Sequence, residues 1–130
     1  MFFLFILIAI TYICTTYLSP SLQDYSKGYA IKNVTPLLDV LEKYKKENND
    51  YPDALTLLVP KYIDKIPSTK VLTIRNIEYK KYSGSYTLLM MQYTNGWDMD
   101  VILYNPDNLY DIPESQLKTF GNWRYYHINK

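Results

Sequence analysis

The N-terminal segment constrains this chain more than any other part of it. Residues 1–18 carry no charged side chain, and only Thr and Tyr place hydroxyl groups in an otherwise apolar run. A helix over this range is about 27 Å long, which is close to the roughly 30 Å of a bilayer's hydrocarbon core. The sequence therefore predicts a transmembrane anchor over residues 1–19, followed by one domain over residues 20–130.

A cleaved signal peptide is the alternative for this segment. No Lys or Arg precedes the apolar run, and no clear pair of small residues at cleavage spacing follows it, so the sequence favours a retained anchor. Two positive side chains, Lys27 and Lys32, and one negative side chain, Asp24, follow the apolar run. By the positive-inside rule, this excess of positive charge favours a cytoplasmic domain.

Composition excludes several classes of function. A net charge of +1 gives no electrostatic footprint for nucleic acid. Cys14 is the only cysteine, so an intramolecular disulfide and a cysteine-based metal site are both excluded. The 15 Tyr, against 4 Phe and 2 Trp, indicate either a thin domain whose core lies close to its surface or a contact surface.

Beyond Pro20, apolar residues recur at steps of three and four, which predicts an amphipathic helix with one apolar stripe. The predicted helix-packing residues are Leu22, Tyr25, Tyr29, Val34, Leu37, Leu38, Leu41 and Tyr44. Pro36 predicts a kink or a restart of the helix, with Thr35 as N-cap. The polar residues 48–50 end it.

After the helix, Asp53 is predicted to cap a short helix over residues 54–59. The period then changes to that of strands, which are predicted over 71–82, 86–93, 97–104 and 122–128. A bulge is expected near Arg75-Asn76, and Asn95-Gly96 predicts a hairpin turn. The fold class is therefore α+β, with a helix on one face of an antiparallel meander.

Acidic residues near the third predicted strand suggest a metal site. Asp98 and Asp100 point the same way from that strand, and with Asp107 and Asp111 they are candidates for calcium, which takes oxygen ligands. The alternative is a solvated strand face followed by a polar loop. His127, the only histidine, is interpreted as a structural strand residue because nothing completes a triad or zinc site around it. No enzyme is predicted.

Four segments, in order, resemble type IV pilins and type II secretion pseudopilins. The apolar run with residues 18–25 (LSPSLQDY) resembles the end of the membrane half of a pilin helix. Residues 41–52, with their closing Tyr-Pro, resemble the end of the long pilin helix, and residues 55–67 resemble the pseudopilin segment with Leu, Val-Pro, Tyr and Ile-Pro. The strand beginning Trp123-Arg124-Tyr125 is similar to the closing strand of small pilin-like domains.

The resemblance implies a long N-terminal helix, part membrane and part soluble, packed on a small antiparallel sheet. It implies a minor pilin or pseudopilin-type structural subunit of a type II secretion or type IV pilus system, with other pilin-like subunits or secretion-machine components as partners. It also implies a single pass through the inner membrane with the domain periplasmic or extracytoplasmic, against the lean of the flanking charges. Some pseudopilins bind calcium in their C-terminal loop, so calcium is the one cofactor it suggests.

The chain departs from the family at its start. Pilins carry a basic leader ending in Gly and then a Glu within the apolar run. The family's spacing from Pro20 places that Glu at Phe3, no Glu occurs before Glu42, and no Gly precedes Met1. In lipid such a carboxylate needs a partner, and it guides assembly by pairing with a neighbouring subunit's amine. Its absence favours a minor or tip subunit, or a stand-alone anchored domain.

A signal-anchored extracytoplasmic binding module, with an aromatic sheet surface for peptide or sugar, is the alternative function. Because side chains alternate along a strand, at most half of the candidate aromatic residues can be exposed. These candidates are Tyr79, Tyr82, Tyr86, Tyr93, Trp97, Trp123, Tyr125 and Tyr126.

Overall fold

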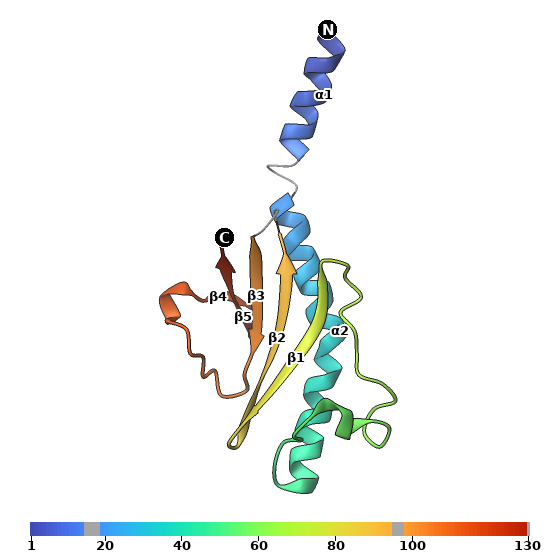
Figure 1. Ribbon diagram of the computed structural model, residues 1–130, viewed down its shortest axis with the longest axis vertical. Helices are drawn as coiled ribbons and strands as arrows, with labels where there is room; N and C mark the ends of the chain where they lie inside the picture. The colour runs from blue at the N-terminus through green and yellow to red at the C-terminus, as the bar shows by residue number, and fades with distance from the viewer. Residues whose placement is uncertain (15–18, 95–97, 130) are drawn as a thin grey trace.

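The computed structural model describes residues 1–14, 19–94 and 98–129, and it shows an α+β architecture (Figure 1). The helices and strands are α1 (Phe2–Ile13), α2 (Ser19–Asn48), the 3₁₀ helices η2 (Leu55–Leu58) and η3 (Glu114–Gln116), and the strands β1 (Ile74–Tyr82), β2 (Ser85–Tyr93), β3 (Met99–Tyr104), β4 (Lys118–Phe120) and β5 (Trp123–Ile128). Helix α2 lies along one face of a five-stranded antiparallel sheet, which confirms the predicted fold class.

The predicted long N-terminal helix is not shown as a single element. Helix α1 has 12 residues and α2 has 30, and residues 15–18 between them lie outside the described ranges. No side chain of α1 is buried. Within the described part of the chain, none of the helices combines the length and the apolar character required to cross a bilayer.

Helix α2 runs without interruption through Pro36, so the predicted restart of the helix is wrong. Thr35 caps nothing, because its hydroxyl donates a hydrogen bond back to the Ile31 carbonyl oxygen at 2.8 Å. Proline costs the helix one backbone hydrogen bond. The fully buried Val34 and Leu37 on either side of Pro36 hold this turn on the sheet, and their packing outweighs that loss. The helix ends as predicted, at Asn48.

The buried stripe of α2 differs from the predicted one. Its members are spaced three and four residues apart: Lys27, Ala30, Val34, Leu37 and Leu41. Leu38 and Tyr44 pack at its border.

The expectation that Leu22, Tyr25 and Tyr29 continue this stripe is wrong. Their side chains are 62%, 73% and 43% exposed. Each residue turns a helix by about 100°, so a shift of one or two positions from Lys27 and Ala30 carries a side chain away from the sheet.

The sheet has the order β1-β2-β3-β5-β4. The first three strands form the predicted meander, and the predicted irregularity near Arg75-Asn76 is confirmed by a register shift between Ile74 and Ile77. The Asn95-Gly96 turn and Trp97 lie outside the described ranges.

Strand β4, at the edge of the sheet, was not predicted. Strand β5 inserts beside β3, and the short β4 forms the outer edge. The inserted strand carries the buried Trp123, whereas β4 exposes Lys118 and Thr119, as is usual for an edge strand. The four predicted strands therefore form the predicted meander, as β1, β2, β3 and β5, and β4 is added to it at the edge.

A tyrosine cluster closes the core at the end of the sheet away from α1. The buried ring of Tyr86 contacts the rings of Tyr51, Tyr79 and Tyr104, with centroid distances of 4.6, 5.7 and 6.1 Å. Tyr104 in turn contacts Trp123 at 5.2 Å. Of the remaining aromatic candidates, Tyr82 and Tyr93 are exposed, and Tyr125 and Tyr126 are half-buried. Much of the tyrosine content therefore builds a core close to the surface.

Asp53 does not cap the short helix η2, whose N-cap is Ala54 without a side-chain hydrogen bond. Its carboxylate instead accepts a hydrogen bond from Lys81 Nζ at 2.7 Å, and Asp50 pairs with the same ammonium at 2.8 Å. These two ion pairs raise the pKa of Lys81 above its ordinary value. The contact ties the turn after α2 to the end of β1.

We expect Leu37→Ala and Leu41→Ala each to lower the free energy of unfolding by about 2–5 kcal/mol, because each removes a fully buried side chain. Chemical unfolding of the full chain, followed by circular dichroism, measures this. Leu22→Ala is the matched control, since it removes the same atoms from an exposed site of the same helix. Equal losses for Leu22 and Leu37 would contradict the assignment of the buried face.

We expect Tyr86→Phe to leave stability at pH 7 unchanged or to raise it by up to about 1 kcal/mol. The Tyr86 hydroxyl is buried and has no hydrogen-bond partner among the described residues.

The same variant should also unfold less readily in alkali. Burial raises the pKa of Tyr86 above its ordinary value and raises the pKa of Tyr79 to about 12. The folded chain therefore keeps protons that the unfolded chain loses above about pH 10, so stability falls as pH rises through that region. The fall should be shallower in Tyr86→Phe than in Tyr93→Phe, which alters an exposed ring and serves as the control.

Candidate functional site

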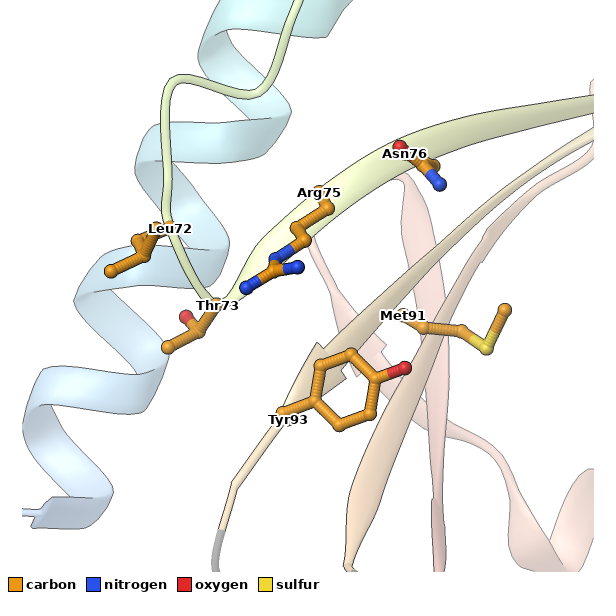
Figure 2. A pocket seen from close by; sticks show the side chains of 6 residues that line it. All are labelled: Leu72, Thr73, Arg75, Asn76, Met91 and Tyr93. Carbon is orange, nitrogen blue, oxygen red and sulfur yellow. The ribbon is translucent and has the colours of Figure 1, made fainter.

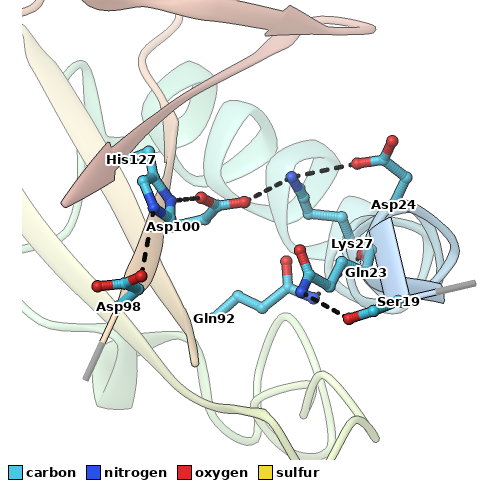
Figure 3. Close-up of polar contacts among 8 residues, drawn as sticks. All are labelled: Ser19, Gln23, Asp24, Lys27, Gln92, Asp98, Asp100 and His127. Atoms are coloured by element: carbon cyan, nitrogen blue, oxygen red, sulfur yellow. Dashed lines mark hydrogen bonds and ion pairs between the residues drawn. The ribbon is translucent and has the colours of Figure 1, made fainter. Parts of the chain in front are cut away.

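Polar side chains gather where α2 begins, at the sheet end that lies beside its first turns. Gln92 on β2, Asp100 on β3 and His127 on β5 are in register across adjacent strands and face α2. Gln23 and Lys27 approach them from the helix (Figure 3). Residues far apart in the sequence thus form one cluster.

Lys27 is 1% exposed, which is unusual for a lysine. Its ammonium lies 2.8 Å from Asp100 Oδ2 and 3.3 Å from Asp24 Oδ1. The same Nζ lies 3.7 Å from the centroid of the Tyr125 ring. The buried charge is therefore compensated by two carboxylates and by an aromatic face.

Asp100 joins the helix to the last strand. One carboxylate oxygen accepts from Lys27, and the other lies 2.7 Å from His127 Nδ1. Since an ionised carboxylate only accepts hydrogen bonds, Nδ1 carries the proton in this contact. The second ring nitrogen, Nε2, lies 4.0 Å from Asp98. We call the set Asp24, Lys27, Asp100 and His127 the Lys27 clamp.

Gln92 adds a neutral contact beside the clamp. Its side-chain amide donates to the backbone carbonyl of Gln23 at 3.0 Å, and Gln23 in turn donates to the Ser19 hydroxyl at 3.3 Å (Figure 3). The start of α2 is therefore fixed to β2 by a neutral hydrogen bond at Gln23 and to β3 by the charged contact of Lys27 with Asp100.

The chemistry of the cluster is that of a structural lock. The described contacts of His127 are to carboxylates, whereas a hydrolytic triad needs a hydroxyl or thiol beside the imidazole. Lys27 is ion-paired and enclosed, so it offers no free amine. What the arrangement can do is hold the start of α2 in one position on the sheet.

The four predicted calcium ligands do not meet. Asp98 and Asp100 lie at one end of β3 and both face His127. Asp107 and Asp111 lie in the loop that follows the other end of this strand, which is roughly 20 Å long. Asp100 is already engaged by two donors. Among the described residues, no group of three or more His, Cys, Asp or Glu side chains is placed to hold a metal ion.

The opposite face of the sheet is open to solvent. At the end that also carries the clamp, it is hollowed by a cavity of about 620 Å³. Figure 2 shows its lining, which consists of Leu72, Thr73, Arg75, Asn76, Met91 and Tyr93. Arg75 makes no ion pair within the described ranges, and Leu72 is 82% exposed. The described lining of this hollow includes no buried polar side chain.

Sequence reasoning missed the burial of Lys27. A signal was nevertheless present, because Lys27 lies three residues before Ala30 and seven before Val34, at the spacing of the buried stripe. Extending that stripe backward places a charge on the core face, and a buried charge requires a partner of opposite sign. Asp100, which was considered as a calcium ligand, is that partner.

Known proteins provide no family for comparison. No protein family model, curated protein or solved structure matches this chain. The functional argument therefore depends on the molecule's own geometry.

We expect Lys27→Met to lower the free energy of unfolding by about 3–5 kcal/mol, because it leaves the buried Asp100 carboxylate without its ammonium. The double variant Lys27→Met, Asp100→Leu should lose less, since it removes both charges. Denaturant unfolding measures both. Lys32→Met, on an exposed position of the same helix, is the control and should stay within about 0.5 kcal/mol of the unmodified chain. A loss below about 1 kcal/mol for Lys27→Met would show that the clamp contributes little.

Proposed function

We propose that this chain is a membrane-anchored, pilin-like structural subunit, of the minor pilin or pseudopilin type, in a type II secretion or type IV pilus system, and not an enzyme. The observation that carries the proposal is the exposure of α1. Apart from Thr11 and Tyr12 its side chains are apolar, none of them is buried, and Phe2 and Phe3 are 79% and 82% exposed. Exposed apolar surface on this scale marks a contact with lipid or with other proteins.

The first turns of α2 also carry exposed apolar and aromatic side chains. Leu22, Tyr25 and Tyr29 are exposed there, although they stand in a helix whose neighbouring side is buried on the sheet. Leaving a large apolar side chain in water costs roughly 1.5–3 kcal/mol relative to burial. In a pilin-type assembly these residues pack on the helices of neighbouring subunits.

The Lys27 clamp supports a structural role. Together with the Gln92 contact, it fixes the start of α2 to β2, β3 and β5, so this part of the helix cannot shift on the sheet without breaking these polar contacts. A structural subunit needs a helix that is held firmly on its sheet in this way.

The segments that resemble pilins also have structural roles. Tyr51, in the Tyr-Pro pair after α2, is buried in the tyrosine cluster, and Leu58 of the following segment is fully buried. The proposed partners are other pilin-like subunits or secretion-machine components. The proposed location is the inner membrane, with a single pass and the domain periplasmic or extracytoplasmic.

Cys14 provides the test, because it is an exposed free cysteine immediately after α1. A disulfide requires two Cα atoms within about 7 Å, so it reports close approach of two anchor segments. We expect the full chain, expressed in bacterial membranes and oxidised, to give a dimer that reductant reverses. It should also stay in the membrane fraction after an alkaline carbonate wash.

Two variants make the crosslink specific. Cys14→Ser should give no dimer, and Cys14→Ser combined with Glu114→Cys moves an exposed thiol to η3, where we expect little dimer. The proposal is wrong if carbonate releases the protein. A monomer after oxidation, while Cys14 still reacts with a maleimide, would also contradict assembly.

A further inference from the structure

The open face of the sheet carries a second hollow, larger than the one in Figure 2 and at the opposite end of the strands. It has a volume of about 860 Å³ and lies between the sheet and the loop that follows β3. Leu89 and Leu103 form an apolar floor, and the rings of Tyr82, Tyr110 and Tyr126 line its sides. A volume of this size is typical of ligand sites in proteins.

One wall of the hollow is the loop after β3, and a buried side chain holds this loop in place. Asn105 is 4% exposed and holds the loop in place. Its side-chain oxygen accepts hydrogen bonds from the backbone of Asp107 at 2.8 Å and of Leu109 at 3.3 Å, while its amide donates to the Thr87 hydroxyl at 3.3 Å. The Tyr110 hydroxyl lies 3.2 Å from the Asn105 backbone nitrogen and accepts its hydrogen bond. The loop therefore stands over the sheet as a fixed wall.

One polar group in this hollow is unused. Ser85 is 8% exposed and lines the hollow, and its hydroxyl has no hydrogen-bond partner among the described residues. Most buried hydroxyl groups in proteins are hydrogen-bonded, and leaving one unpaired costs free energy. An unpaired hydroxyl beside the apolar floor of this hollow is suited to pair with one polar atom of a bound molecule.

The charges at the mouth have both signs. Glu78 and Lys80 are exposed on β1, and Asp111 is exposed on the loop. This arrangement favours neither an anionic nor a cationic polymer. A sugar would bring several hydroxyl groups onto Leu89 and Leu103, where they would lose water without gaining partners. A peptide instead brings one apolar side chain, flanked by amides.

We propose that this hollow binds a polypeptide segment that inserts one large apolar side chain over Leu89 and Leu103 and pairs a backbone amide group with the Ser85 hydroxyl. The hollow reaches from Tyr82 on β1 across β2 and β3 to Tyr126 on β5. Three inter-strand spacings are roughly 14 Å, which is the length of about four extended residues. The site goes beyond the proposed function and does not depend on it.

N-acetyl-phenylalanine amide is the test probe, because it carries one aromatic side chain between two amides. It is titrated into the isotopically labelled full chain in phospholipid nanodiscs, and amide resonances are followed by nuclear magnetic resonance. We expect shifts confined to the hollow, including Ser85, Leu89 and Leu103, with a dissociation constant on the order of 1 mM for a ligand of this size. N-acetyl-glycine amide, without the side chain, should bind at least about tenfold more weakly.

Three variants locate the site. Leu89→Ala should weaken binding about tenfold by removing part of the floor, and Ser85→Ala about threefold to tenfold by removing the hydroxyl. Ser85→Ala changes a single oxygen, so it keeps the test decisive if Leu89→Ala fails to fold. Met91→Ala is the matched control, since it lies two residues along the same face of β2 but lines the other hollow, and it should change affinity by no more than about twofold.

The proposal is overturned if maltose shifts these amides and the phenylalanine derivative does not. It is also overturned if no probe shifts them up to about 20 mM. Equal affinity in the unmodified chain, Leu89→Ala and Ser85→Ala would place the binding elsewhere. None of these outcomes bears on Cys14 crosslinking, so failure here is distinguishable from failure of the proposed function.

Discussion

The burial of Lys27 against Asp100 is the contact on which the arrangement of this molecule depends. An ammonium can be enclosed only where a carboxylate meets it, so the pair allows one position of α2 along the sheet. Apolar contacts between Val34, Leu37 and the strands supply the larger share of the burial energy, but such contacts tolerate sliding more readily than a paired charge does. The charged pair therefore fixes the register that the apolar face stabilises.

With α2 in this position, the two faces of the sheet have different surroundings. The face toward α2 is filled by the helix stripe and the tyrosine cluster, with the Lys27 clamp at one end. The open face keeps apolar side chains such as Leu89 and Leu103 beneath a loop held by Asn105. A core that is one helix thick cannot cover both faces, so the sequence leaves one face for other contacts.

Local pattern predicted the elements better than it predicted their neighbours. The strands at residues 86–93 and 122–128 alternate clearly, and both are present as β2 and β5. The restart at Thr35 and the cap at Asp53 failed for a shared reason. Each rests on a short-range preference, and each was overridden by a contact from elsewhere in the fold: the packing of Val34 and Leu37 in one case and Lys81 in the other.

The candidate site shows the same division. The residue types at Asp98, Asp100 and His127 were visible in the sequence, but a calcium interpretation of Asp100 depended on neighbours that the chain order does not reveal. In the structure, that carboxylate pairs with Lys27, which lies 73 positions away in the sequence. The Ser85 hydroxyl had no signal at all, because a serine in a strand is ordinary until its surroundings leave it buried and unpaired.

The sequence by itself determined the apolar N-terminal segment, the long amphipathic helix and the strand-forming segments, since these follow from composition and from periods of 3.6 and 2 residues. The tertiary structure alone decided which side of the helix is buried, that β5 enters between β3 and β4, and that Lys27, Asp100 and His127 form one cluster. The physical reason is that periodicity acts within a few residues. Pairing of charges and filling of volume act between segments that only the folded chain brings together.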